Sequence, residues 1–108
     1  MQNTFRLADS ECSFISQALV LAADKYIGFA VDACGIPGGI RLQQQFLRQA
    51  CEARKFAIAF GDSDGIEIPT GTNLRQAGHD AGRITNQQFA DTIKERIADG
   101  SLPQKAVA

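Results

Sequence analysis

Side chains that carry metal and covalent chemistry are scarce in this sequence. Its 108 residues include one histidine and three cysteines: His79, Cys12, Cys34 and Cys51. Structural zinc sites pair their ligands at short spacing, because one turn must aim two thiolates at one ion, and these cysteines are far apart. A cysteine nucleophile would have only His79 as its base. We therefore expect no catalytic residues, no metal site and no cofactor, and a protein that is not an enzyme.

A strong charge of one sign is also missing. The formal net charge is -1, so nothing draws the whole chain to nucleic acid or to an anionic membrane. The apolar stretch 18–34 is interrupted by Asp24, Lys25 and Asp32, and charges are costly inside a bilayer. No basic run followed by a small-residue cleavage site marks a signal peptide, and an odd number of spaced cysteines is typical of a reducing compartment. We expect a cytoplasmic protein without a membrane segment.

The remaining composition is typical of a globular protein. Hydrophobic residues make up 44% of the chain and charged residues 21%, which argues against disorder. A chain of this length has room for one domain. We expect a single compact domain over residues 1–100 and a flexible tail over residues 101–108.

The first predicted helix begins near Asp9 or Ser10, either of which can cap it, and ends near Cys34. Apolar residues recur at helical spacing along two neighbouring stripes, so the apolar surface is wide. One stripe holds Ile15, Leu19, Ala22, Tyr26, Phe29 and Ala33, and the other holds Val20, Ala23, Ile27, Ala30 and Cys34. One partner helix would cover both with difficulty, which indicates a central position in the fold or a subunit interface.

The run Gly35-Ile36-Pro37-Gly38-Gly39 ends this helix, because glycine suits a helix cap and proline removes a hydrogen-bond donor. A second helix is predicted over residues 40–55, with an apolar stripe formed by Leu42, Phe46, Ala50, Ala53 and Ala57. So short a connection predicts an antiparallel helical hairpin.

The spacing of the apolar residues changes over residues 56–68. Phe56, Ile58 and Phe60 alternate with alanines, and a turn-forming run, Gly61-Asp62-Ser63-Asp64-Gly65, precedes Ile66 and Ile68. Alternation about such a turn predicts a short β-hairpin. The rival interpretation is that the second helix continues to Phe60.

A helix pair is expected at the carboxy terminus. Leu74 begins a short helix, Gly82 breaks it, Thr85 and Gln88 form a capping-box pattern, and Gly100 ends the last helix. Residues 74–97, with Gly82-Arg83-Ile84-Thr85 before Phe89 and Lys94, resemble a SHOCT-type module, a short helical hairpin thought to mediate oligomerisation. The stretch lacks the second leucine of that pattern near Ala77 or Gly78, and Gln88 replaces its usual glutamate. Together these elements predict a helix-dominated α+β domain: an N-terminal antiparallel helical hairpin, a short β-hairpin and a C-terminal helix pair.

Two surfaces suggest binding. Gly38, Gly39 and Arg41 lie at a helix amino terminus, where free N–H groups and the helix dipole favour an anion such as a nucleotide. Basic side chains predominate over residues 38–60 and acidic ones over residues 61–73, and such a dipolar surface can steer a charged partner. The residues that would contact this partner are Arg41, Arg48, Lys55, Asp62 and Asp64.

These observations favour a small non-enzymatic protein-binding module, a homo-oligomeric adaptor or inhibitor of the phage or mobile-element type. Its expected oligomer interface holds Val20, Ala23, Ile27, Phe89 and Ile93. An anionic-ligand domain built on the Gly35–Arg41 loop is the first alternative. A DNA-binding regulator that uses the C-terminal helix pair is the second, although the last helix carries little positive charge, which disfavours nucleic acid.

Overall fold

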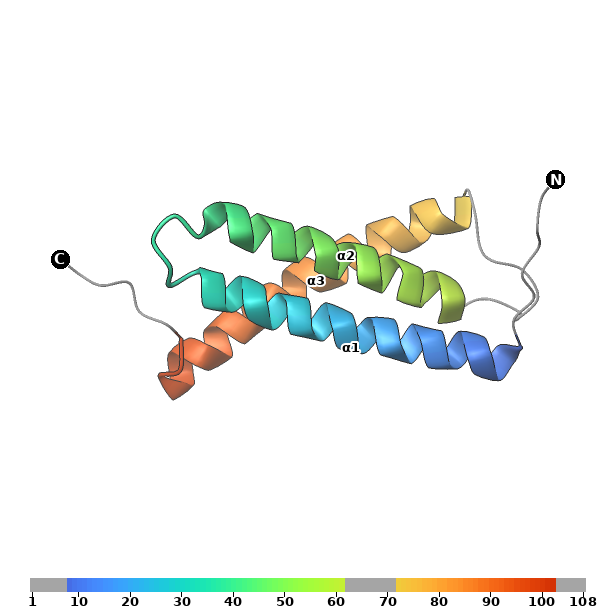
Figure 1. Cartoon of the computed structure of the whole chain (residues 1–108), viewed down its shortest axis with the longest axis horizontal. Coiled ribbons are helices and arrows are strands. Elements are labelled where there is room, and N and C mark those ends of the chain that lie inside the picture. Colours follow the sequence, from blue (N-terminus) through green and yellow to red (C-terminus); the bar gives the residue numbers. More distant parts are fainter. Residues whose placement is uncertain (1–7, 62–71, 103–108) are drawn as a thin grey trace.

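Three helices make up the part of the chain that the computed structural model describes, residues 8–61 and 72–102. Helix α1 spans Asp9–Ala33, α2 spans Ile40–Gly61 and α3 spans Thr72–Asp99. Figure 1 shows α1 and α2 antiparallel and side by side, with α3 crossing behind both at an oblique angle. The molecule is elongated, with extents of 60 × 27 × 18 Å.

Helix α1 begins and ends close to where the sequence predicts, but its N-cap is Ala8, so neither Asp9 nor Ser10 caps it. Its first turn carries Asp9 and Glu11, whose negative charges interact favourably with the amino-terminal end of the helix dipole. Glu11 also reaches back and accepts a hydrogen bond from the backbone N–H of Ala8, at 2.9 Å. At the other end the Gly35–Gly39 run turns the chain into α2, so the predicted helical hairpin is confirmed.

The glycines of this turn are required by the backbone. Gly38 has a φ of +73°, in the left-handed region that favours glycine. A Cβ on Gly39 would lie 2.3 Å from the carbonyl oxygen of Ala33, so only glycine lets α2 begin this close to the end of α1.

The predicted α+β fold class is wrong, because the described residues form helices and no strand. Phe56 to Gly61, which include the first expected strand, are the last turns of α2. Ala57 and Ala59 are buried, so the alternation of large and small residues reflects helix packing and not a pleated strand. The rival interpretation, a second helix that continues to Phe60, is confirmed; the second expected strand lies outside the described residues.

The predicted helix pair at the carboxy terminus is also wrong, because α3 runs without a break through Gly78 and Gly82. A glycine inside a helix costs about 1 kcal/mol relative to alanine but does not end it. Ala77, Ala81 and Thr85 are buried at four-residue spacing, and this continuous inner stripe holds the helix against its neighbours. Thr85 therefore lies in mid-helix and does not begin a new one.

The end of α3 at Gly100 is confirmed. Gly100 has a φ of +77°, and the N–H groups of Ser101 and Leu102 donate to the carbonyl of Arg96 at 3.0 and 3.2 Å. This arrangement is a common glycine-dependent helix ending.

Small side chains dominate the core. The buried apolar residues of the described part are mostly alanines, and only Ile27, Val31 and Thr85 are both large and fully buried. An aromatic cluster joins α1 to α2 beside this core: the rings of Tyr26 and Phe46 stack with centroids 6.3 Å apart, and Phe29 lies 5.3 Å from Phe46. Alanines let the helices approach closely, so many of the large apolar residues are left outside.

Candidate interaction surface

Large apolar side chains lie on the surface of α1, on the side away from α2 and α3. Phe14 is 72% exposed and Leu21 is 66% exposed. Glu11, Ala18 and Lys25 are exposed on the same side, because residues three, four and seven apart share one face of a helix. We call these five residues, Glu11, Phe14, Ala18, Leu21 and Lys25, the outer face of α1.

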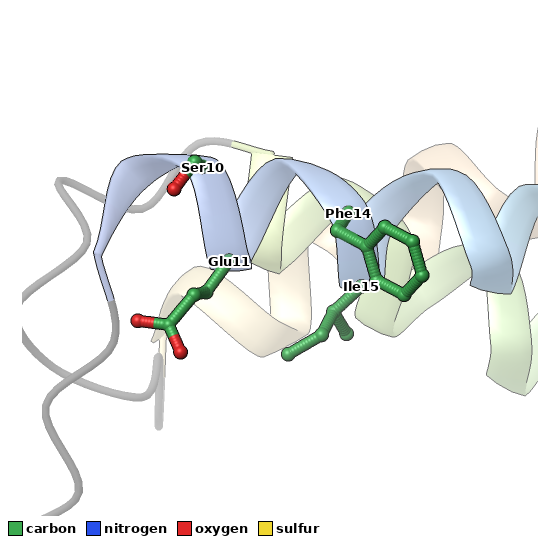
Figure 2. Close-up of a pocket in the computed structure, with 4 residues that line it drawn as sticks. All are labelled: Ser10, Glu11, Phe14 and Ile15. Atoms are coloured by element: carbon green, nitrogen blue, oxygen red, sulfur yellow. The ribbon is translucent and has the colours of Figure 1, made fainter.

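A shallow hollow lies at the amino-terminal end of this face. It has a volume of about 290 Å³ and is lined by Ser10, Glu11, Phe14 and Ile15. Figure 2 shows the side chains of Glu11, Phe14 and Ile15 projecting from α1 around this hollow. The outer face therefore offers both a protruding aromatic ring and a depression beside it.

The apolar character of α1 extends around most of its circumference. Its 25 residues have a mean hydropathy of 1.4 in their most apolar window, which would suffice by length and composition for a membrane span. Only 22% of that window is buried within the protein. A helix that is apolar on all sides is usually buried, so α1 has more apolar surface than α2 and α3 cover.

Polar contacts fix another side of α1 to the other two helices. Arg54 of α2 forms an ion pair with Asp24 of α1 at 3.2 Å and donates a short hydrogen bond to the Oε1 of Gln88 of α3. The amide nitrogen of Gln88 donates to the same Asp24 carboxylate at 2.9 Å. We call Asp24, Arg54 and Gln88 the polar junction, and because it joins all three helices it sets which side of α1 points outward.

Two buried polar atoms have no hydrogen-bond partner among the described residues: Nε of Arg54, in the polar junction, and Oγ1 of Thr85 on α3. The Arg54 side chain is 11% exposed, whereas that of Asp24 is 47% exposed, so the guanidinium of this ion pair is shielded from water and the carboxylate is not. Beside it, a second shallow hollow of about 440 Å³ follows α3, lined by Arg83, Ile84, Gln87, Gln88 and Asp91. All of its lining residues come from one helix.

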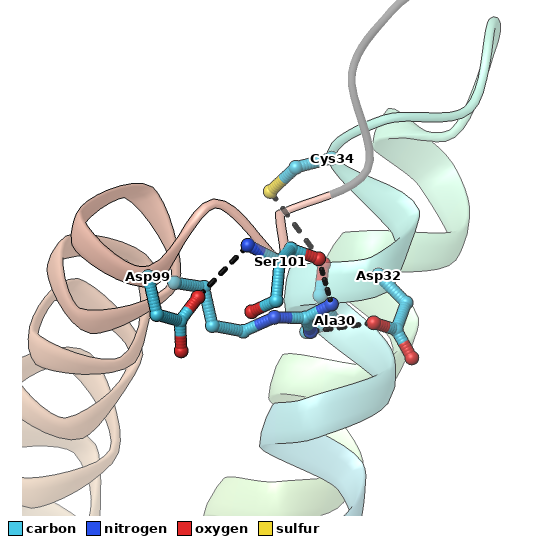
Figure 3. A network of polar contacts seen from close by, with 6 residues as sticks. Ala30, Asp32, Cys34, Asp99 and Ser101 are labelled. Atoms are coloured by element: carbon cyan, nitrogen blue, oxygen red, sulfur yellow. Dashed lines mark hydrogen bonds and ion pairs between the residues drawn. The ribbon is translucent and has the colours of Figure 1, made fainter.

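A second polar cluster holds the carboxy-terminal end of α3 against α1 (Figure 3). Arg96 forms an ion pair with Asp32 and donates to the backbone carbonyl of Ser101 at 3.0 Å. The thiol of Cys34 donates to the carbonyl of Ala30 at 3.6 Å. Burial raises the pKa of the Cys34 thiol, and the nearby Arg96 charge opposes that increase.

The residues predicted to hold an anion have other roles or face solvent. Gly38 and Gly39 allow the backbone conformation of the turn, and Arg41 is exposed on the first turn of α2. The N–H of Gly39 donates within the turn, to the carbonyl of Ile36 at 2.9 Å. The three residues thus lie close together, but the turn alone is enough to explain why glycine stands at positions 38 and 39.

The residues predicted to steer a charged partner are only partly placed together. Arg41 and Arg48 are exposed, whereas Lys55 is half-buried, pairs with Glu52 at 2.7 Å and lies 5.1 Å above the ring of Phe56. Asp62 and Asp64 lie outside the described residues.

The residues predicted to form an oligomer interface lie mainly inside the monomer. Ala23 and Ile27 belong to the core cluster, and Phe89 and Ile93 pack against it. Val20 is 38% exposed. The inner stripe of α1 thus packs largely within the chain, whereas Phe14 and Leu21 on the outer face are the most exposed large apolar side chains in the described part of α1.

The cysteines and the histidine differ in burial. Cys12 is buried, Cys34 and Cys51 are half-buried and His79 is exposed. Within residues 8–61 and 72–102, no three histidine, cysteine, aspartate or glutamate side chains are close enough together to hold a metal ion.

Reasoning from the sequence missed the outer face, although Phe14, Ala18 and Leu21 follow one another at spacings of four and three. This third stripe was hidden because two longer apolar stripes occupy the same helix. The polar junction was missed as well, since nothing in the local sequence pairs Asp24 with Arg54 and Gln88.

Comparisons with known proteins add no identification: no protein-family model, no curated protein and no solved structure matches this chain. The SHOCT-type resemblance of residues 74–97 therefore stays a prediction.

Proposed function

We propose that this chain is a small non-enzymatic protein-binding module that works as a homo-oligomer. One observation carries the proposal: Phe14 and Leu21 are exposed on the outer face of α1, beside a hollow, in a protein whose core is built mostly of alanines. Large apolar side chains that gather on one exposed face mark interaction surfaces more often than isolated ones do.

The packing of the three helices supports a surface role for this face. The polar junction attaches another side of α1 to α2 and α3, and the Arg96–Asp32 ion pair holds its carboxy-terminal end to α3, so Phe14 and Leu21 stay directed at solvent. A preorganised face loses little side-chain and backbone freedom when a partner binds, which favours association.

Protein is a better partner for this face than lipid or nucleic acid. The outer face carries one acidic and one basic residue, so it has no surplus positive charge to attract phosphate groups. The carboxylate of Asp24, in the middle of α1, is engaged by Arg54 and Gln88, and a spanning α1 would lose both contacts. We propose a cytoplasmic setting, which agrees with the odd number and wide spacing of the cysteines in the sequence.

Light scattering at several concentrations tests the proposal. The wild-type mass should rise above the monomer value of 11.6 kDa as the concentration increases. Leu21→Glu should hold the mass near that of the monomer, because a charge would be buried without a partner. Ile97→Glu is the matched control, since Ile97 is 62% exposed on α3, away from the outer face. A wild-type mass that stays at 11.6 kDa at all concentrations would contradict the proposal.

A further inference from the structure

The outer face of α1 is complementary to itself when two copies run antiparallel. Glu11 and Lys25 lie seven residues before and after Ala18, so they stand at equal distances from it and carry opposite charges. Phe14 and Leu21 lie at nearly equal distances from Ala18 in the same way. A two-fold axis beside Ala18 places each position of one copy opposite the position equally far from Ala18 in the other.

We propose that a second copy of this chain docks on the outer face of α1, antiparallel to it and crossing at Ala18; this inference rests on the proposed function. In that arrangement Glu11 of each copy meets Lys25 of the other, and Phe14 of each copy packs against Leu21 of the other. Every contact occurs twice. The small side chain of Ala18 lets the two helices approach closely at their crossing point.

The hollow at the amino-terminal end of α1 fits this arrangement. It is lined by Ser10, Glu11, Phe14 and Ile15, which lie three to eight residues before Ala18. The residues opposite them in the partner lie three to eight positions after Ala18 and include Leu21 and Lys25 of the second copy. The Leu21 side chain and the aliphatic part of Lys25 therefore enter the hollow, and both hollows of the dimer are filled at once.

Charge selects the antiparallel orientation over the parallel one. A parallel pair in register would place Glu11 against Glu11 and Lys25 against Lys25, and like charges placed opposite one another destabilise a pairing. Neither residue forms an ion pair with another residue of the described part, so both charges are open to a partner. Glu11 uses one oxygen, Oε1, to accept from Ala8 and keeps the other.

Zero-length coupling with a carbodiimide tests the geometry. The reagent joins a carboxylate to an amine only when they touch, and Glu11 and Lys25 of one chain are about 21 Å apart along the helix. A coupled Glu11–Lys25 peptide, found by mass spectrometry in the dimer band, therefore comes from two chains. The experiment is run with a reductant, so that no disulfide joins the copies. We expect this peptide to be a major product of the dimer.

Charge-reversal variants are a second test of the proposed pairing. Glu11→Lys and Lys25→Glu each turn two attractive pairs into two repulsive ones, and each should weaken association about tenfold. An equimolar mixture of the two variants should restore it, because each mixed dimer again has a Lys–Glu pair at both ends. Lys25→Glu leaves the Ala8 contact of Glu11 intact, so its effect does not depend on how well α1 begins.

The outcomes separate the two proposals. A wild-type protein that stays monomeric overturns both. Association without the Glu11–Lys25 peptide, or association that neither variant weakens, overturns the antiparallel pairing and leaves the proposed function standing. Binding of the monomer to neutral phosphatidylcholine vesicles, with no dimer at any concentration, overturns both in favour of a lipid surface.

Discussion

The buried hydroxyl of Thr85 gives a sharp prediction about stability. Thr85 is 2% exposed, and its Oγ1 has no hydrogen-bond partner among the described residues. A buried hydroxyl without a partner costs about 1–3 kcal/mol of folding free energy. Valine has nearly the same shape and a similar helix propensity, so Thr85→Val removes this cost and little else.

We expect Thr85→Val to raise the free energy of unfolding by about 1–2 kcal/mol, at the lower part of that range because the denatured chain also buries some polar groups. For a domain of this size each kcal/mol raises Tm by about 4–8 °C. Thr85→Ser is the matched control: it keeps the hydroxyl and loses a methyl group, so it should lower stability by about 1 kcal/mol.

Urea unfolding followed by circular dichroism, at one fixed protein concentration, measures both variants. An unchanged m-value with a higher midpoint for Thr85→Val is the expected result. A loss of more than about 0.5 kcal/mol in Thr85→Val would refute the reasoning, because it would mean that the hydroxyl is satisfied in solution, for example by the carbonyl one turn earlier in α3.

Three further predictions concern the polar clusters. Arg54→Met should lower the free energy of unfolding by no more than about 1 kcal/mol, because Asp24 is half exposed to water. Arg54→Ala also loses the packing of the aliphatic part of the side chain and should lower it by about 2–3 kcal/mol. Thermal unfolding distinguishes the two variants. Burial raises the pKa of the Cys34 thiol, so its alkylation near pH 8 should be slower than that of an unfolded peptide, and Arg96→Gln should slow it further; faster alkylation would contradict the burial. Hydrogen bonds from Ser101 lower the pKa of Asp99, so its contribution to stability is present above the pKa of the unfolded chain and is lost as pH falls through the folded value. A carboxyl NMR titration of Asp99 that gives the ordinary value of about 3.9 would contradict this last point.

Local sequence signals predicted the first half of the fold well. The start of α1, the glycine-rich turn and the antiparallel hairpin follow from helix-capping and helix-ending chemistry that acts within a few residues. The end of α2 was harder, because Phe56, Ile58 and Phe60 alternate with alanines. That pattern fits a strand as well as a helix whose small residues are buried, and only packing decides between them.

The second half was mispredicted for a related reason. Gly82 and the Thr85–Gln88 pair suggested a break, yet the buried stripe of Ala77, Ala81 and Thr85 keeps α3 continuous. The stabilising energy comes from contacts with other helices, and it outweighs the local preference for a turn.

The apolar excess of α1 was predicted, but the side of the helix on which Phe14 and Leu21 are exposed was not. The sequence showed that α1 has more apolar surface than one partner helix could cover, and this excess is present. Which side stays exposed depends on the polar junction, whose members are up to 64 positions apart in the chain. Contacts at that separation carry no local signal, so the expected interface fell on Ala23 and Ile27, which the monomer uses for its own core.

Self-association through the outer face of α1 is tested most directly by amide chemical shifts in a dilution series. Backbone ¹H–¹⁵N spectra recorded from about 1 mM down to about 10 µM cover the affinities expected of so small an interface. We expect the amides from Glu11 to Lys25 to shift with concentration, most strongly around Ala18, while those of Arg41 and Arg48 on α2 stay constant. Spectra that do not change over this range, or changes confined to α2 or α3, would contradict the account.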